Sequence, residues 1–280
     1  MSDSAMDASR KAARDWWRTE VVDISPGIIR MRGYPIEQLI GRVDFPQMIW
    51  LMLRGGLPSK AEADLLTAVL VGSVDHGPHA PSIAIARMAA TCGVGINNAM
   101  ASAINVLGDV HGGAGEQAMT LYAEIAAAES KGAPLAAATA AAIDAFFASG
   151  EKFVPGFGHR FHPIDPRAPR LLEIVDAAAK VGTVRGRFAA VGRAVEADLM
   201  RRKGKRVPMN IDGVSAVVFA ELGFPPPLGR GLFILSRAVG ILAHAWEQTQ
   251  QGGRNKGPIP PEFLYTYAGV PPRDVDKDIR

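Results

Sequence analysis

Hydrophobic residues along this chain recur mostly at the three- and four-residue spacing of amphipathic helices. Ser59 and Glu62 have the spacing of a capping box, in which each side chain bonds the backbone N–H of the other residue, and they predict a helix to about Gly72. Before it, Pro46 stands where a first-turn proline is favourable, just ahead of the apolar run 48–53. The pattern therefore predicts two helices before residue 73.

The rest of the chain continues the helical pattern. Pro81 and Ser82 open a long alanine-rich helix that we expect to reach toward Gly108. Alternating strand patterns are almost absent, although 16–29 and 264–267 could pair briefly. Further helices are expected at 114–130, 134–149, 168–181, 187–202, 214–222 and 229–250. The predicted fold class is all-α.

Glycines divide the chain at two places, 111–115 and 204–213. If these are hinges, residues 112–213 form a small helical domain inserted into a large one made of 1–111 and 214–280. An active site would then lie in the cleft between the two domains, where closure excludes water.

Composition is that of a globular protein, with 280 residues of which 21% are charged and 48% hydrophobic. The net charge of +3 and the pI of 9.1 are mildly basic. This balance suits an anionic substrate or a phosphate-bearing cofactor, and it is too small to indicate nucleic acid.

The expected compartment follows from cysteine usage and from the apolar segments. Cys92 is the only cysteine, so the chain has no intrachain disulfide, and a reducing cytoplasm is expected. The first residues carry acids where an export signal carries bases. The most apolar run, 231–246, contains Arg237 and His244 and is shorter than the roughly 20 residues that span a membrane. We therefore expect a soluble protein without a membrane partner.

Three polar residues beside glycines are the strongest candidates for chemistry. His111 is followed by two glycines, His159 follows Gly158, and Asp212 precedes Gly213. Glycine lets the backbone approach a ligand and leaves the neighbouring imidazole accessible. Two imidazoles and a carboxylate that converge can enolise a substrate and protonate an oxygen. The structural alternatives are a core histidine at 111 and a solvated charged loop after residue 159.

The segment 75–79 places His76 and His79 in one turn before an expected helix. Zinc binding is one interpretation, but cysteine and glutamate are absent at ligand spacing, and we predict no metal site. A helix-capping turn, in which Asp75 or His76 bonds the backbone, is the second. Substrate binding is the interpretation we favour.

Two groups of positive charge also need a partner. Arg237 lies in an apolar run, where an unpaired guanidinium costs several kcal/mol. Its partner is an internal acid such as Glu221 or, in the interpretation we favour, a ligand carboxylate. The basic run 201–206 is typical of a solvated loop, and its alternative role is a phosphate contact for a nucleotide-like cofactor.

These motifs resemble those of the citrate synthase superfamily from about Gly27 to Gly269. The segment 27–36 is similar to the family's early Arg-Gly-Tyr turn, and 156–159 with 165–167 resembles its signature. Two departures are visible. The spacing from His159 to Arg167 is one residue short, and Phe161 replaces Ile or Val.

Within the superfamily, two segments look more like citryl-CoA lyases and the C-terminal module of ATP-citrate lyase than like synthases. Segment 75–78 reads Asp-His-Gly-Pro where synthases read Asp-His-Glu-x-Asn, and segment 210–213 reads Asn-Ile-Asp-Gly where they read Asn-Val-Asp-Phe. Synthases also carry a C-terminal arginine that reaches the partner subunit's substrate. Pro260 and Glu262 stand there in this chain, so the second carboxylate contact of the synthases is missing unless Arg254 substitutes.

The resemblance implies a role for each site residue. Asp212 would be the base for the methyl proton of acetyl-CoA, His111 would stabilise the enol, and His159 would exchange a proton with the carbinol oxygen. The dicarboxylate would be held by His76, Arg167 and Arg237. The adenine of coenzyme A would lie against the backbone of Val154, Pro155, Gly156, Phe157 and Gly158.

The resemblance also implies a mostly helical homodimer that takes a coenzyme A thioester as substrate and binds no cofactor tightly. We favour reversible cleavage of citryl-CoA to acetyl-CoA and oxaloacetate. The alternatives are condensation of acetyl-CoA with oxaloacetate or another 2-oxoacid, and a coenzyme A-binding homologue without turnover. The expected partners are acetyl-CoA or citryl-CoA and a small dicarboxylate, and not nucleic acid.

Overall fold

The computed structural model describes residues 3–159, 162–260, 262–263 and 265–274. Helices dominate this part of the chain, which confirms the predicted class. The helices are α1 (Asp3–Trp16), α2 (Ile36–Leu39), α3 (Phe45–Arg54), α4 (Lys60–Ser73), α5 (Pro81–Thr91), α6 (Ile96–Ile104), α7 (Ala114–Ser130), α8 (Leu135–Ala148), α9 (Arg167–Lys180), α10 (Arg187–Lys203), α11 (Ile211–Glu221) and α12 (Pro226–Gln251). The strands are β1 (Val22–Ser25), β2 (Ile28–Met31) and β3 (Tyr34–Pro35).

The chain packs into two compact units. The first unit is Met1–Val74 with Asp109–Arg237, and the second unit is Asp75–Gly108 with Ala238–Arg280. The domain bounds inferred from the glycines, 112–213 inside 1–111 and 214–280, stay a prediction.

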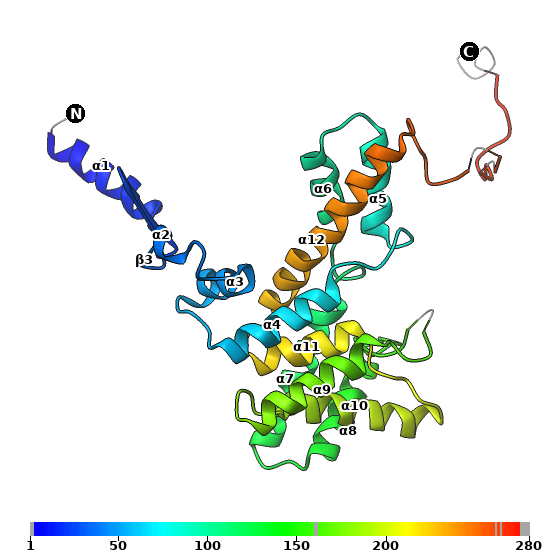
Figure 1. Cartoon of the computed structure of the whole chain (residues 1–280). Helices are drawn as coiled ribbons and strands as arrows, with labels where there is room; N and C mark the ends of the chain where they lie inside the picture. Colours follow the sequence, from blue (N-terminus) through cyan, green and yellow to red (C-terminus); the bar gives the residue numbers. More distant parts are fainter. Residues whose placement is uncertain (1–2, 160–161, 261, 264, 275–280) are drawn as a thin grey trace. The chain divides into compact units, whose positions relative to one another are not determined.

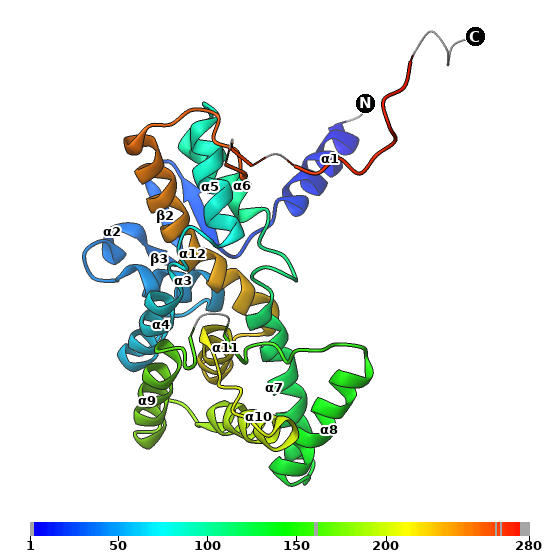
Figure 2. The ribbon, with the colours of Figure 1, turned by 90° about the vertical axis from the view of Figure 1, so that its right-hand side faces the viewer.

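Helix α11 is the centre of the first unit (Figures 1 and 2), where it packs on α7, α10, α9 and α4. Val214, Val217 and Val218 are fully buried, because α11 is covered on several sides. A helix that is apolar all round is stable only when neighbours surround it. The start of α11, which carries Asp212, is therefore fixed by the core.

The starts of two early helices are those that the sequence predicts. Ser59 and Glu62 form the expected capping box at α4. Pro46 lies in the first turn of α3, which also has a capping box made by Asp44 and Gln47. These side chains satisfy backbone N–H groups that have no partner inside the helix.

Strands β1, β2 and β3 form a small antiparallel sheet in that order. The expectation that 16–29 pairs with 264–267 was wrong for 22–25, which pairs with the neighbouring segment 28–31. Gly27 and Gly33 at the two turns have φ of +75° and +88°, which only glycine adopts without strain. Leu264 lies outside the described residues.

The second unit corrects the single long helix expected from Pro81 to Gly108. Two helices, α5 and α6, pack against each other instead. Gly93 has a φ of +83°, and Gly95 is the N-cap residue of α6, so the chain turns between them. A left-handed residue cannot continue a right-handed helix.

Helix α12 is longer than the apolar run that predicted it. Among the described residues it is the one helix long and apolar enough to cross a membrane by length and composition. Core helices of soluble proteins pass the same test, and Leu232, Arg237, Ile241 and Ala245 of α12 are buried. That the protein has no membrane partner stays a prediction.

Glu221, at the end of α11, caps the start of α10. Its carboxylate accepts hydrogen bonds from the backbone N–H groups of Arg185, Gly186, Phe188 and Ala189, at 2.6–3.3 Å. Glu221 is thereby committed to a helix end, where an anion is favoured. It is not available as the internal acid for Arg237.

We expect Glu221→Ala to lower the free energy of unfolding by about 1–3 kcal/mol, because it leaves several partly buried N–H groups without acceptors. Urea denaturation of the whole chain measures this. Glu173→Ala, which removes an exposed carboxylate from α9, is the control and should change stability by less than about 0.5 kcal/mol. Equal stability of the two variants would contradict the capping role.

Candidate active site

The loop before His159 and the start of α11 are bonded directly to each other. The backbone N–H of Asn210 donates to the Gly156 carbonyl at 2.9 Å, and that of Gly158 donates to the Pro208 carbonyl at 2.7 Å. The Asn210 side chain donates to the Gly158 carbonyl at 2.7 Å. The segments that carry His159 and Asp212 therefore lie side by side, although some 50 residues separate them in sequence.

Asn210 also orients the first turn of α11. Its side-chain oxygen accepts from the backbone N–H of Asp212 at 2.9 Å and from that of Gly213 at 3.2 Å. This is a helix N-cap, and Asp212 stands in the first turn, where the helix dipole favours a carboxylate. Sequence reasoning named Asp212 and missed this role of Asn210, although an asparagine ahead of an apolar run signals a helix start.

Gly156 and Gly213 make the closest approach between the two segments. A Cβ on Gly156 would lie 2.6 Å from the Gly213 Cα atom. A Cβ on Gly213 would lie 2.6 Å from Met209 Cγ and closer still to the Gly156 carbonyl oxygen. Gly156 also has a φ of +85°. Both positions need glycine, and a phenylalanine at 213 does not fit this backbone.

Asp165 ties Arg167 to the same place. Its fully buried carboxylate accepts two bonds of 2.9 Å from the Arg167 guanidinium and one of 2.9 Å from the Ile211 backbone N–H. Burial raises the pKa of Asp165, but these hydrogen bonds outweigh it and hold the pKa below its usual value. Asp165 is a second residue whose role sequence reasoning missed, because its partner Ile211 is 46 positions away.

Arg237 is buried, with 4% of its surface exposed. Its Nε donates to the Ser73 carbonyl at 3.2 Å, and its guanidinium lies 4.8 Å from the centre of the Phe233 ring. A carbonyl and an aromatic face both stabilise a buried cation. This environment suits the predicted contact with a ligand carboxylate, which stays a prediction.

Arg237 acts on both His111 and Asp212. Burial lowers the pKa of the half-buried His111, and the positive charge of Arg237 lowers it further. Burial raises the pKa of Asp212, against the opposing effect of Arg237 and Arg167 and with a small contribution from Asp165. The site therefore favours a neutral imidazole, which can donate a hydrogen bond, and a carboxylate that is a stronger base than usual.

His159 has a defined tautomer. Its Nδ1 accepts a hydrogen bond of 3.0 Å from the backbone N–H of His162, and the two rings lie 4.6 Å apart. A neutral imidazole that accepts at Nδ1 carries its proton on Nε2. His159 is thus prepared to donate a proton or hydrogen bond through Nε2.

Beside His159 is a hollow of about 610 Å³. One wall is Phe153, Phe157 and the 162–163 segment, and the other is the 203–208 segment, including Lys203, Lys205 and Arg206. Lys203 lies 5.9 Å from the centre of the exposed Phe153 ring. The hollow therefore combines an aromatic wall with three cations.

The basic run 201–206 divides into two parts. Arg201 and Arg202 pair with Asp198 on α10, and Arg202 also pairs with Asp144 at 2.5 Å. Lys205 and Arg206 line the hollow, and Arg206 also bonds Glu196 at 2.8 Å. The first part has a structural role, and the second part lines the hollow.

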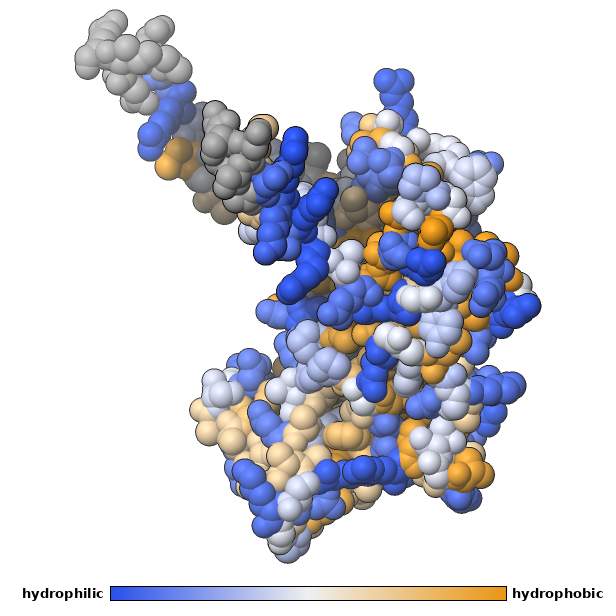
Figure 3. Space-filling view, turned by 90° about the vertical axis from the view of Figure 1, so that its left-hand side faces the viewer, coloured by the Kyte–Doolittle hydropathy of each residue, from blue (hydrophilic) through white to orange (hydrophobic). Residues whose placement is uncertain are grey.

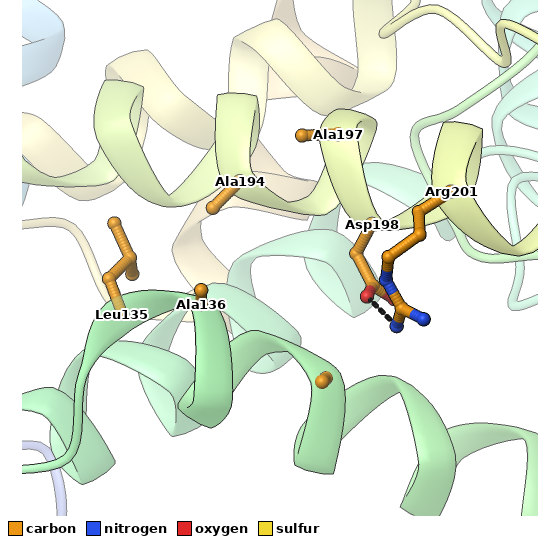
Figure 4. Close-up of a pocket in the computed structure, with 7 residues that line it drawn as sticks. Leu135, Ala136, Ala194, Ala197, Asp198 and Arg201 are labelled. Carbon is orange, nitrogen blue, oxygen red and sulfur yellow. Dashed lines mark hydrogen bonds and ion pairs between the residues drawn. The ribbon is translucent and has the colours of Figure 1, made fainter.

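A second hollow of about 590 Å³ lies between α8 and α10 (Figure 4). Its lining is mostly alanine, with the Asp198–Arg201 pair at one end. The lower part of the molecule in Figure 3 has a pale orange area with hydrophilic residues beside it. The predicted site residues lie elsewhere, so this hollow offers them no chemistry.

His76 belongs to the second unit, and the other predicted site residues belong to the first. In its turn, the Asp75 carboxylate accepts from the Gly77 N–H at 3.1 Å, as the capping alternative expected. Gly77 has a φ of +80°, and its Cβ position faces the His79 ring at 3.3 Å. The His76 and His79 rings lie 5.6 Å apart. In the part of the chain that is described, three metal-ligating side chains do not meet at any point.

Comparison with known proteins assigns the fold to a family. The profile of "Citrate synthase, C-terminal domain" matches residues 11–68 and 58–259. The chain belongs to the citrate synthase family. It is 29% identical over 201 residues to a citrate synthase of Acidithiobacillus ferridurans, which covers 70% of this chain and 50% of the relative. The chain thus spans about half the length of that curated relative.

Two solved structures extend the likeness to nearly the whole chain. Citryl-CoA lyase from Hydrogenobacter thermophilus superimposes with a TM-score of 0.82 and 31% identity, over 94% of this chain and 98% of the other. ATP citrate lyase from Methanothrix soehngenii, in complex with citrate and coenzyme A, has a TM-score of 0.73 and 20% identity over 93% of this chain and 44% of the other. The second likeness establishes the fold alone.

We expect Asp212→Asn to raise the free energy of unfolding at pH 7. A pKa raised by folding means that ionised Asp212 destabilises the native state above its unfolded pKa of about 3.9. The gain should therefore shrink as the pH falls toward 4. Urea denaturation at pH 7 and pH 4.5 measures it.

Asp64→Asn is the control for this experiment, because Asp64 is an exposed carboxylate that pairs with Lys60 on α4. It should change stability little at either pH. A lower stability of Asp212→Asn at pH 7 would show that the charge of Asp212 is compensated in the native state.

Proposed function

We propose that this protein catalyses the reversible cleavage of citryl-CoA to acetyl-CoA and oxaloacetate. The observation that carries the proposal is the end-to-end match to a citryl-CoA lyase, which covers 98% of that chain. The backbone at Gly156 and Gly213 adds physical support, because it excludes the phenylalanine of the synthase pattern.

Asp212 and His111 carry the chemistry at the acetyl group. In the cleavage direction the carbinol proton passes to His159, the bond between the carbinol carbon and the acetyl methylene breaks, and its electron pair forms the enolate of acetyl-CoA. His111 donates a hydrogen bond to the enolate oxygen, and Asp212, protonated at the start, gives its proton to the methylene carbon. A thioester α-proton is very weakly acidic, so the enol needs a donor that is in place before the reaction. The neutral His111 and the more basic Asp212 suit these roles.

His159 acts at the carbinol oxygen. The tautomer that this hydrogen bond implies, with the proton on Nε2, suits protonation of the oxaloacetate carbonyl in the condensation direction. Cleavage must start with Nε2 unprotonated and the proton on Nδ1, which then cannot accept from the His162 N–H. Cleavage therefore requires loss of this hydrogen bond.

The hollow beside His159 supports the proposal that the substrate is a coenzyme A thioester. Phe157 and Gly158, the last two residues of the proposed adenine contact from Val154 to Gly158, line the hollow. Lys203, Lys205 and Arg206 supply positive charge for phosphates, and phosphate contacts are the alternative role of the basic run. The ATP citrate lyase of the same fold was solved with coenzyme A and citrate bound. His76, Arg167 and Arg237 complete the proposal as the dicarboxylate contacts.

Condensation of acetyl-CoA with oxaloacetate is the second candidate, because the curated relatives are named citrate synthases. The two functions differ in hydrolysis of the citryl thioester. The unaltered chain, mixed with citryl-CoA, should release acetyl-CoA and oxaloacetate. Mixed with acetyl-CoA and oxaloacetate, it should release no free coenzyme A. Release of free coenzyme A in the second mixture would establish a synthase.

Asp212→Asn should slow exchange of the acetyl-CoA methyl protons with deuterated water by about 10²-fold or more, in the presence of a non-reacting dicarboxylate, as expected for loss of a general base. Coenzyme A affinity should stay the same, because its contacts lie elsewhere. NMR measures the exchange. His111→Ala should also slow it, and His159→Ala should affect it less than carbon–carbon bond formation. Exchange at the normal rate in Asp212→Asn would mean that another group is the base.

We also propose a homodimer in the cytoplasm. Val239, Leu242 and Trp246 of α12 are spaced by three and four residues and are 59%, 43% and 58% exposed. Such a stripe on one helix face is typical of an interface.

Light scattering at micromolar concentration should give about twice the chain mass of 29.7 kDa. Val239→Glu with Leu242→Lys should reduce that mass, because burying the new charges against a second copy is costly. Val181→Glu is the control, because it places a charge at another exposed apolar residue, the C-cap of α9, and should leave the mass unchanged. A chain that is active as a monomer would contradict the dimer.

A further inference from the structure

The turn that carries His76 is attached to α12 through a chain of polar side chains in the second unit. The Asp75 carboxylate and His244 Nε2 are 3.2 Å apart, and His244 Nδ1 lies 3.3 Å from a guanidinium nitrogen of Arg87. Arg87 also bonds Glu247 at 2.5 Å and Gln251 at 2.6 Å. The His244 and Arg87 side chains are 18% and 15% exposed, so this is not a loose surface pair.

Donor and acceptor chemistry gives His244 one orientation in this chain. A guanidinium only donates, so the Nδ1 atom of His244 must accept from Arg87. The ring proton is then on Nε2, which donates to Asp75. Arg87 thereby fixes the tautomer in which His244 can bond Asp75.

Asp75 in turn holds the backbone beside His76. Its carboxylate accepts from the Gly77 backbone N–H at 3.1 Å. Burial raises the pKa of Asp75, but the hydrogen bonds from His244 and from the backbone N–H groups of His76 and Gly77 lower it below its usual value. The ionised Asp75 carboxylate therefore links His244 of α12 to the peptide groups on both sides of the His76 Cα atom.

We propose that Asp75 and His244 are positioning residues, which set the orientation of His76 toward the dicarboxylate. This proposal rests on the proposed function, in which His76 is a dicarboxylate contact. The bond between Asp75 and the Gly77 N–H fixes only the local backbone. The bond between His244 of α12 and Asp75 fixes the turn relative to the rest of its unit. Losing that bond should weaken dicarboxylate binding and leave coenzyme A binding unchanged.

Two substitutions of similar polarity separate the two bonds of His244. A glutamine amide nitrogen reaches about as far as Nε2, so His244→Gln keeps a donor for Asp75. An asparagine amide reaches only as far as Nδ1, so His244→Asn loses that donor. Glu247→Gln is the matched control, because it alters the Arg87 end of the chain and leaves the Asp75–His244 bond in place.

Isothermal titration calorimetry of the whole chain with oxaloacetate, and separately with coenzyme A, tests the proposal. We expect His244→Asn to weaken oxaloacetate binding about ten-fold, and His244→Gln and Glu247→Gln to change it less than about three-fold. In the His76→Ala background, His244→Asn should have almost no further effect, because it acts through His76. Coenzyme A affinity should be the same in all variants.

Other outcomes distinguish failure of the positioning role from failure of the proposed function. If the unaltered chain binds oxaloacetate and His244→Asn binds it equally well, the positioning role is overturned and the proposed function stands. Additive effects of His76→Ala and His244→Asn would also overturn it, as would equal losses in coenzyme A and oxaloacetate affinity. Failure of the unaltered chain to bind oxaloacetate or to cleave citryl-CoA would overturn the proposed function and the positioning role together.

Discussion

The approach of Gly156 to Gly213 is the constraint on which the site depends. It lets two backbone segments meet without side chains between them, so that Asn210 can bond both sides of the contact. A loop is normally more mobile than the helices it connects. Here the loop before His159 is held against the start of the most enclosed helix of the first unit, so it shares the rigidity of the core.

Buried charge then gives the predicted catalytic residues their different properties. Arg237 is a cation placed near a histidine and an aspartate, and it favours the neutral form of one and the ionised form of the other. Burial disfavours the ionised form of Asp212 and outweighs the effect of Arg237, so the pKa of Asp212 is raised. Ionised Asp212 is thus destabilised at the place where proton transfer is proposed. Such destabilised charges are common in active sites.

Much of the fold could be predicted from the sequence, because its signals are local. The capping box at Ser59 and the proline at 46 mark real helix starts. The break between α5 and α6 was missed, because alanine-rich periodicity on both sides outweighed the glycines at 93 and 95. The alignment of His159 with Asp212 was expected from their residue types, whereas the contacts that align them were not. Asp165 and Glu221 bond partners more than 30 residues away, and no local pattern encodes those bonds.

The pairing of Arg167 with Asp165 has a kinetic consequence. Two of the guanidinium's donors already bond a buried carboxylate, so the proposed dicarboxylate would meet a pair with no net charge. Attraction between such a pair and an anion is weaker than that of a lone cation, and the complex dissociates faster. For an enzyme that cleaves, the released keto acid must leave before the next turnover. In the proposed dicarboxylate site, a neutralised arginine would favour product release over tight retention.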